Sequence, residues 1–423
     1  MNVPVSSDTT HVQSRTVLTL MGSQTLGGIG VASGIAVGAI VAADVSGRDA
    51  LSGLATTTQV LGGALFTIPI AALMGRWGRR VGLATAYLVG AVGALLAIVA
   101  TTLGIFWLLL LGTTLFGAST TANSQARYAA TDLAVPERRG RQLSWVVWAT
   151  TIGSVLGPNL VGPGRAVAQL LGLPSLAGAW VFSAAGFLLA AVVLHVALRP
   201  DPLLLARQVS DAATGTPAPA ATRRGNVGAG LRLIAATPAA LWGTTAVTLG
   251  HVVMVSVMVM TPLHMRHGHA EIELIGLVIS LHILGMYGLA PVTGQLTDRW
   301  GPRPVVLLGV GLLVLASLFA GLSGDGHSTT LTVGLILLGL GWSCTLVAGS
   351  GVVAGSVPVV QRASVQGAAD LVMGLSAAAG GALAGVVMDL FGYAVLCAGA
   401  AVVALALAAY TLASNHGRRP VGA

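Results

Sequence analysis

The stretch Gly294–Arg303, which reads GQLTDRWGPR, is a short polar turn between two long apolar segments. Its charged residues are Asp298, Arg299 and Arg303. An imperfect copy, AALMGRWGRR, occurs earlier, at Ala71–Arg80. Gly301 and Gly78 hold the same place in the two stretches, so the copies lie 301 − 78 = 223 residues apart in a chain of 423. The sequence therefore predicts two related halves, each with a basic turn between two apolar segments.

The composition is that of a membrane protein. Hydrophobic residues make up 55% of the chain and charged residues only 8%, whereas soluble domains carry about 25% charged residues. The apolar runs are about 20 residues long, which suits membrane-spanning helices and is too long for the strands of a membrane barrel. The 21 basic residues are all arginine and border these runs, so we expect no nucleic-acid partner.

Charged residues, glycine and proline divide the sequence into twelve apolar segments. They cover residues 17–44, 51–74, 81–102, 105–129, 143–163, 176–198, 238–261, 274–296, 304–322, 329–352, 364–388 and 392–414. The longest polar stretch, 199–237, follows the sixth segment and is rich in proline, alanine and threonine at its centre. We predict an all-α membrane protein with twelve transmembrane helices in two pseudo-symmetric six-helix bundles, 1–198 and 238–423, joined by a linker at 199–237.

The arginines gather on one side of the predicted membrane. Only Arg48, Arg165 and Arg266 fall on the side away from the termini, which leaves 21 − 3 = 18 on the other. The positive-inside rule then places both termini, both polar turns and the linker in the cytoplasm. We expect a multi-pass protein of a bacterial cell membrane, that is, the inner or plasma membrane.

The polar turns resemble a family signature. The pattern G-x-L-x-D-R-x-G-R-[KR] lies between helices two and three in the major facilitator superfamily of secondary transporters. The second copy matches it at Gly294, Asp298, Arg299, Gly301 and Arg303, and the first copy keeps Arg76, Gly78, Arg79 and Arg80. The resemblance implies a cytoplasmic latch that uses the acid of the motif. In the first copy Gly75 stands in place of that acid, and Asp132 is the candidate to replace it.

A second pattern bears on the direction of transport. Residues 153–162, GSVLGPNLVG, resemble the motif G-x-x-x-G-P-x-x-G-G, which is typical of antiporters in the same superfamily. The matching residues are Gly153, Gly157, Pro158 and Gly162. The resemblance favours export over import. The alternative is ordinary helix packing, since glycines at this spacing let membrane helices approach closely and proline bends a helix.

Three titratable residues lie inside predicted spans of the second half: His251, His282 and Asp370. Ionisable side chains are costly in a membrane and mark functional sites by default. Because such groups can take up a proton on one side and release it on the other, all three are candidates for proton coupling. The alternative for His251 is a hydrogen bond to a neighbouring helix, and for His282 a packed surface with Met286 and Tyr287.

The resemblance also implies that helices one, four, seven and ten line a central cavity. The cavity candidates are Gln24, Asn123, Gln125, Arg127, Met254, Met258, Tyr287 and Trp342. Arg127 either attracts an anionic group into the cavity, or it extends to the membrane interface or pairs with a nearby acid. A wall rich in apolar side chains, sulfur and hydroxyls favours an uncharged or amphiphilic organic molecule over a sugar or a phosphate ester.

These features predict a secondary active transporter that couples efflux of small lipophilic or amphiphilic compounds to the proton gradient by alternating access. An importer or facilitator of a small organic nutrient in the same fold is the alternative. A membrane enzyme acting on lipid is a remote alternative, because the chain has no HExxH and no G-x-S-x-G. We therefore expect no enzyme activity.

No cofactor is expected apart from the proton gradient as energy source. The expected partners are a small-molecule substrate and the lipid bilayer, and the expected oligomeric state is a monomer. The histidines His264, His267 and His269 form a cluster in an outer loop. A metal ion could bind them, but a solvated loop explains the same residues, so no metal site is predicted.

Overall fold

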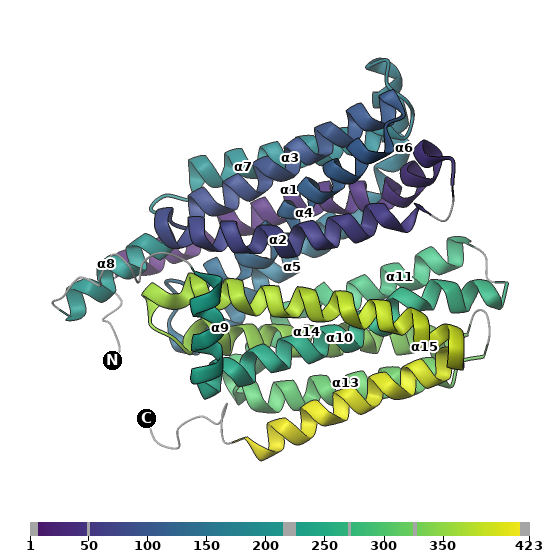
Figure 1. Cartoon of the computed structure of the whole chain (residues 1–423). Helices are drawn as coiled ribbons and strands as arrows, with labels where there is room; N and C mark the ends of the chain where they lie inside the picture. The colour runs from purple at the N-terminus through teal and green to yellow at the C-terminus, as the bar shows by residue number, and fades with distance from the viewer. Residues whose placement is uncertain (1–6, 49–50, 215–225, 270–271, 325–327, 415–423) are drawn as a thin grey trace. The chain divides into compact units, whose positions relative to one another are not determined.

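The chain is helical in the computed structural model, which describes residues 7–48, 51–214, 226–269, 272–324 and 328–414 (Figure 1). The first half forms α1 (Ser7–Ser46), α2 (Gly53–Trp77), α3 (Arg79–Leu103), α4 (Phe106–Ala129), α5 (Arg139–Asn159), α6 (Val161–Leu170) and α7 (Ala177–Ala197). The linker region carries α8 (Pro202–Thr214) and α9 (Val227–Ala236). The second half forms α10 (Pro238–His267), α11 (Ile272–Tyr287), α12 (Ala290–Trp300), α13 (Pro302–Gly321), α14 (Thr329–Gly355) and α15 (Arg362–Ala413). The predicted all-α fold is confirmed, since the described ranges contain no strand.

The helices are consistent with twelve membrane crossings. Nine helical stretches within the described residues are long and apolar enough to span a bilayer, and α4 and α5 lie on two further predicted spans. One stretch, Val359–Ala413, is 55 residues long and holds the last two predicted spans, which meet where Gly392 leaves helical geometry with φ 82°. Another predicted span is divided into α11 and α12 by a break at residues 288–289.

Gly78 and Gly301, the reference glycines of the repeat, share one backbone conformation. Their φ angles are 89° and 90°, in a region that glycine enters without the steric cost of a Cβ atom. Each glycine ends one helix, and the next begins at once, at Arg79 or at Pro302. The same offset recurs at the starts of α4 and α14, which lie 329 − 106 = 223 residues apart. The two halves therefore repeat one structural plan.

Contacts divide the chain into two compact units. Unit 1 comprises Met1–Val135, Ala149–Gly230 and Pro358–Leu371, and unit 2 comprises Pro136–Trp148, Leu231–Val357 and Val372–Ala423. The first turns of α15 thus belong to unit 1, and the first turns of α5 belong to unit 2. The boundaries expected from the sequence, 1–198 and 238–423, follow chain order and stay a prediction.

Small residues let the helices of unit 1 approach an aromatic core. Phe116 lies edge-on to Trp180 at a centroid distance of 5.4 Å and to Phe187 at 5.0 Å. Gly34 on α1 lies against this cluster, where an added Cβ would come within 2.8 Å of the Trp180 ring. Close backbone approach at small residues is a main packing device of membrane helices.

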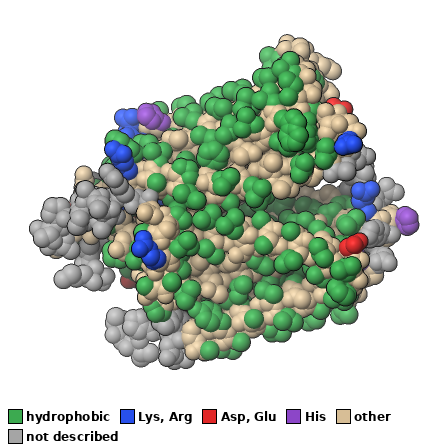
Figure 2. Space-filling view, in the orientation of Figure 1, with side chains coloured by type: hydrophobic (Ala, Val, Ile, Leu, Met, Phe, Trp, Pro, Cys, Tyr) green, Lys and Arg blue, Asp and Glu red, His purple; other side chains and the backbone are tan. Residues whose placement is uncertain are grey.

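Apolar side chains cover the outer faces of the helices, and charged side chains gather near the helix ends (Figure 2). Mid-helix residues such as Leu95, Leu189, Leu315 and Val402 are between 46% and 64% exposed. On a soluble protein an apolar surface this extensive would drive association. In lipid it is the expected surface, since the backbone groups are already bonded within the helices.

Candidate functional site

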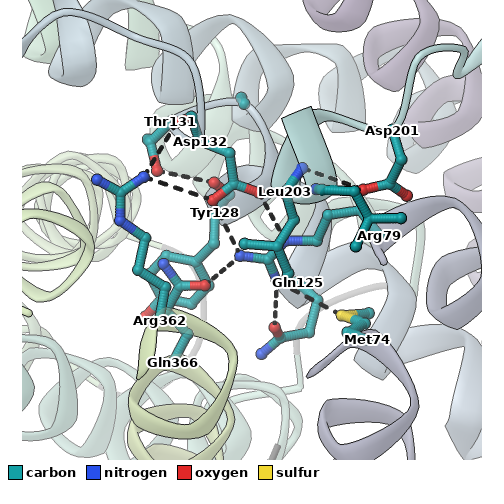
Figure 3. A network of polar contacts seen from close by, with 12 residues as sticks. Met74, Arg79, Gln125, Tyr128, Thr131, Asp132, Asp201, Leu203, Arg362 and Gln366 are labelled. Atoms are coloured by element: carbon teal, nitrogen blue, oxygen red, sulfur yellow. Dashed lines mark hydrogen bonds and ion pairs between the residues drawn. The ribbon is translucent and has the colours of Figure 1, made fainter. Parts of the chain in front are cut away.

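A buried polar network lies in unit 1, where side chains of α3, α4 and the first turns of α15 meet (Figure 3). Its centre is Arg79, the first residue of α3, whose side chain is fully buried. The guanidinium donates to both carboxylate oxygens of Asp132, at 2.8 Å from Nε and 3.3 Å from one Nη. It also donates to Gln125 Oε1 at 3.2 Å and, in a close contact, to Gln366 Oε1. Such two-point pairing with a carboxylate is the arrangement that best offsets the burial of an arginine.

Asp370 lies in the same network. Its Oδ2 accepts from Gln125 Nε2 at 2.7 Å, and its Oδ1 forms a close ion pair with an Nη of Arg127. The Arg127 and Asp370 side chains are 6% and 4% exposed. The Arg127 guanidinium also lies over the Tyr128 ring, 4.7 Å from its centroid. Of the three possibilities that the sequence left open for Arg127, the structure shows the pairing with an acid.

Gln125 connects the two ion pairs. Its amide oxygen accepts from Arg79 while its amide nitrogen donates to Asp370, a double role that neither a carboxylate nor an apolar side chain can fill. Arg362, the first residue of α15, donates to the backbone oxygen of Asp132 at 3.0 Å and lies 3.8 Å from its carboxylate. These residues place three guanidinium groups against two carboxylates. One proton added to Asp370 would therefore remove one of the two negative charges in this network, since Asp132 carries the other.

The second copy of the motif is arranged differently, within unit 2. Asp298 at the end of α12 accepts from the backbone N–H groups of Gly140 and Arg141, both at 2.8 Å. Those groups belong to the first turn of α5, where helical N–H donors have no partner within the helix. Gly294 permits the approach, since an added Cβ would lie 2.6 Å from the backbone oxygen of Gly140. Asp298 thus ties the end of α12 to the start of α5.

The remaining arginines of the two motif copies lie outside the Arg79 network and the Asp298 contact. Arg76 and Arg299 are exposed, and Arg76 lies over the Trp77 ring at 5.0 Å. Arg303 donates to the backbone oxygen of Leu412 at 2.8 Å. The backbone N–H of Arg80 donates to Asp201 of the linker at 2.7 Å. Of the arginines in the first motif copy, Arg79 is the one buried in the network.

The helix-five motif brings α1 and α5 together within unit 1. A Cβ added to Gly153 would lie 2.6 Å from the backbone of Gly28, and one added to Gly157 would lie 2.8 Å from Ser33 N. Ser33 Oγ donates to Gly157 O at 3.2 Å. The helix ends at Asn159, directly after Pro158, and α6 begins at Val161. Gly162 has no described atom within 4 Å of an added Cβ, so its role stays a prediction.

An aromatic and sulfur-rich wall lies in unit 2. The indole N–H of Trp342 on α14 donates to His251 Nδ1 on α10 at 2.7 Å. The Tyr287 ring meets Trp342 edge-on at a centroid distance of 5.5 Å. Met254 and Met258 on α10 contact the same core cluster. His251 thus takes the hydrogen bond to a neighbouring helix, which is the alternative that the sequence left open for it.

His282 joins two helices of unit 2. Its side chain is fully buried, and its Nδ1 donates to the backbone oxygen of Leu335 on α14 at 2.7 Å. The structure therefore places Asp370 in unit 1 with Gln125 and Arg127, and it places His251 and His282 in unit 2 with other partners.

A smaller polar cluster lies at mid-helix in unit 1. Gln24 on α1 donates to Asn123 O at 3.2 Å and to Thr150 Oγ1 at 3.3 Å. Tyr87 on α3 donates to Asn123 Oδ1 at 2.6 Å. Two of the predicted cavity residues are thus brought together with a tyrosine that the sequence did not single out.

Sequence reasoning missed two members of the main network, Arg362 and Gln366. Arg362, Gln366 and Asp370 lie four residues apart on α15, a spacing that puts them on one helix face. This polar stripe was the available signal for Gln366. In the predicted histidine cluster, His264 is buried, lies 4.1 Å from the Tyr393 ring and contacts Ser323 at 3.3 Å. The His267 side chain lies outside the described part of the structure.

Comparisons with known proteins agree with this architecture. The chain is 38% identical over 378 residues to the "Uncharacterized MFS-type transporter YdeG" of Bacillus subtilis, covering 88% of this chain and 86% of that protein. It is 28% identical to the "Riboflavin transporter RfnT" of Brucella anthropi, covering 85% of each. The solved proton:xylose symporter XylE shares the fold with a TM-score of 0.74 at 13% identity, over 95% of this chain and 96% of that one. The family model described as "Major Facilitator Superfamily" matches residues 28–271 and 268–421. The chain therefore belongs to the major facilitator superfamily and is a multi-pass membrane transporter.

Proposed function

We propose that the chain is a proton-coupled transporter that exports small lipophilic or amphiphilic molecules by alternating access. The observation that carries the proposal is the buried contact of Asp370 with Arg127 and Gln125. A carboxylate in this position is the natural proton acceptor of a transport cycle, because it lies within a membrane-spanning helix and forms an ion pair with Arg127.

Protonation of Asp370 would act on the first turns of α15. The neutral acid loses the Coulombic attraction to Arg127, and the guanidinium then stays in the low-dielectric interior without an opposite charge. Breaking a buried ion pair costs about 3–5 kcal/mol. Since about 1.4 kcal/mol changes an equilibrium tenfold, one proton is enough to shift the balance between two conformations.

The arginine distribution supports an orientation for this cycle. We place the turns at Gly78 and Gly301, the linker and both termini on the cytoplasmic side, since 18 of 21 arginines then lie inside. With that orientation the network around Arg79 holds the cytoplasmic end of unit 1, and the Asp298 contact holds that of unit 2. Release of these contacts would open the inward-facing state.

The wall formed by Trp342, Tyr287 and His251 supports the substrate class. Ring faces and methionine sulfur attract flat, weakly polar molecules through dispersion and ring stacking. None of the predicted cavity residues in unit 2 is an arginine that would bind a phosphate. The proposal therefore favours uncharged or amphiphilic compounds with aromatic rings.

Import of a vitamin-like nutrient is a second candidate. The observation that favours it is the similarity to a protein named as a riboflavin transporter, at 28% identity over 85% of both chains. An isoalloxazine ring is flat and aromatic and would suit the same wall. The two candidates differ in direction, because intact cells would accumulate an imported compound and lose an exported one.

Proton flux in proteoliposomes tests the role of Asp370. Purified wild-type protein is reconstituted with a pH-sensitive dye inside, and a gradient of a compound that stabilises the protein is imposed. We expect wild-type protein to move protons against the compound and Asp370→Asn to lose the proton movement. Asp389→Asn is the matched control, because Asp389 lies on the same helix and is exposed. Undiminished coupled proton flux in Asp370→Asn would remove Asp370 from the cycle.

Thermal shift measurements would find the compound used in that assay. A ligand that binds the folded state raises its unfolding temperature, and the stabilisation grows with the logarithm of the ligand concentration relative to its Kd. Riboflavin and ethidium are the first probes, each measured at about pH 6 and about pH 8 so that proton linkage appears as a difference between the two shifts. Transport direction then follows from whether cells that express the protein accumulate or lose the stabilising probe.

A further inference from the structure

We propose that Arg207, on the linker helix α8, is the latch of the first half. It takes the place of the motif's acid, which is missing at position 75 because the chain has glycine there. The inference concerns how one end of unit 1 is held closed, and it is independent of which solute is moved and in which direction. It rests on a comparison of the two copies of the motif, each taken within its own unit.

The second copy shows what an acid does in this position. Asp298 receives the N–H groups of Gly140 and Arg141 at 2.8 Å each. These residues open α5, directly after the short 3-10 turn η2 (Pro136–Arg138). A carboxylate at the exposed start of a helix satisfies N–H groups that have no partner inside the helix. The contact therefore fixes the start of α5 to the end of α12.

The first copy has the same framework without the acid. The 3-10 turn η3 (Val359–Gln361) precedes α15, and both lie 223 residues after their counterparts, since 359 − 136 = 223 and 362 − 139 = 223. The counterpart of Asp298 is residue 298 − 223 = 75, which is glycine. At position 75 itself, a side chain from elsewhere can connect the end of α2 to the turn before α15.

Arg207 makes that connection within unit 1. It is 5% exposed, and one Nη donates to the backbone oxygen of Gly75 at 2.7 Å. The other Nη donates to the backbone oxygen of Val360 in η3 at 3.4 Å. The two donors of one planar guanidinium thus bridge two carbonyl groups. The direction of the hydrogen bonds is the reverse of that at Asp298. Arg207 donates to backbone C=O groups, whereas Asp298 accepts from backbone N–H groups.

Asp201 fixes the start of α8 to the turn between α2 and α3 (Figure 3). Its Oδ1 accepts from the N–H groups of Leu203 and Leu204 at 3.0 and 3.1 Å, and its Oδ2 accepts from Arg80 N at 2.7 Å. Leu203 is fully buried. Helix α8 is therefore held at its start by Asp201 and at its middle by Arg207, which makes the linker part of the closing contact.

Hydrogen exchange of the full-length protein in lipid nanodiscs tests the proposal. Backbone amides exchange when a segment opens locally, so the rate for residues 359–366 reports how firmly the start of α15 is held. We expect Arg207→Ala to raise this rate about fivefold or more. The matched control is Arg199→Ala, which removes the same charge from the linker at a side chain that is exposed. We expect the control to exchange like the wild type.

A rescue distinguishes a latch from general packing. In Gly75→Asp with Arg207→Ala, the new carboxylate stands where Asp298 stands in the second copy and can accept from the first N–H groups of α15. We expect this double variant to return the exchange rate of residues 359–366 to within about twofold of the wild type. A residue that acted only by filling space would not be replaced by an acid on another helix.

Either of two results would overturn the proposal. One is wild-type exchange at residues 359–366 in Arg207→Ala; the other is fast exchange in the double variant with the rest of the chain unchanged. Should Arg207→Ala fail to fold, Arg207→Gln takes its place, because its amide retains donors for one carbonyl. We then expect intermediate exchange, and wild-type exchange in Arg207→Gln would likewise overturn the latch.

Discussion

Arg127 on α4 and Asp370 on α15 form a buried ion pair although 243 residues of chain separate them. Each is more than nine-tenths buried, so neither charge can be solvated by water where it lies. Gln125 holds the other oxygen of Asp370 at 2.7 Å. The stability of this end of unit 1 therefore depends on the two charges together rather than on either one.

Removal of one residue of the Arg127–Asp370 pair is expected to lower the free energy of unfolding more than removal of both. Arg127→Leu leaves a buried carboxylate without its cation and is expected to destabilise the protein by about 3–5 kcal/mol. The double variant Arg127→Leu with Asp370→Leu replaces the pair by apolar contacts and is expected to recover most of that loss. Thermal unfolding of the purified proteins provides the comparison. Additive losses in the double variant would show that the two charges do not interact.

Gln125→Glu is expected to weaken the network in a pH-dependent way. A carboxylate at position 125 can still accept from Arg79 but can no longer donate to Asp370, and it adds a like charge next to it. A proton shared between the two acids relieves the repulsion. At neutral pH the free energy of unfolding of Gln125→Glu should therefore be about 1–3 kcal/mol below that of the wild type, and this difference should shrink as the pH falls. Gln125→Leu is the control, and its deficit should not vary with pH in this way.

Asp298 is expected to show a graded response. Asp298→Ala loses both hydrogen bonds to the start of α5 and should cost about 0.5–2 kcal/mol together with most of the transport activity. Asp298→Asn keeps one acceptor oxygen and should lie between alanine and the wild type. Membrane insertion should be normal in both, as judged by the amount of protein in the membrane fraction. Full turnover in Asp298→Ala would count against a latch at this position.

Gly78→Ala and Gly301→Ala are both expected to destabilise the protein. Both glycines have φ near 90°, where a side chain costs about 1–3 kcal/mol. At Gly78 the added Cβ would also come within 2.5 Å of the Asp201 carboxyl carbon, so the Asp201 carboxylate has to move. Gly311→Ala on α13 is the matched control, because nothing described lies within 4 Å of its added Cβ. The melting temperatures of Gly78→Ala and Gly301→Ala should both lie below that of Gly311→Ala, and equal values for all three would contradict the strain.

The turns and the helices follow from local sequence. Gly78 and Gly301 are recognisable because glycine between two apolar runs, beside arginines, marks a turn that needs positive φ. The apolar segments are recognisable by length, and each predicted span lies mostly on helical residues. Asp370 is recognisable because a carboxylate in an apolar run is rare.

The partners within the site do not follow from local sequence. Nothing near Arg127 indicates Asp370 as its partner, because the contact is made by folding and not by spacing. Arg207 was even harder to find, since it binds backbone oxygens of Gly75 and Val360, and a carbonyl group carries no residue identity. Asp132 was expected to replace the acid missing at position 75. It pairs with Arg79 of the motif and with Arg362 at the start of α15, and its role as a substitute for that acid stays a prediction.

The membership of Pro358–Leu371 in unit 1 has a consequence for biosynthesis. Chains leave the ribosome from the amino terminus, and early domains usually fold while later ones are still being made. Here α4 enters the bilayer with Arg127 long before Asp370 exists. The amino-terminal helices must therefore wait, with Arg127 still lacking its contact to Asp370, until the first turns of α15 have been made.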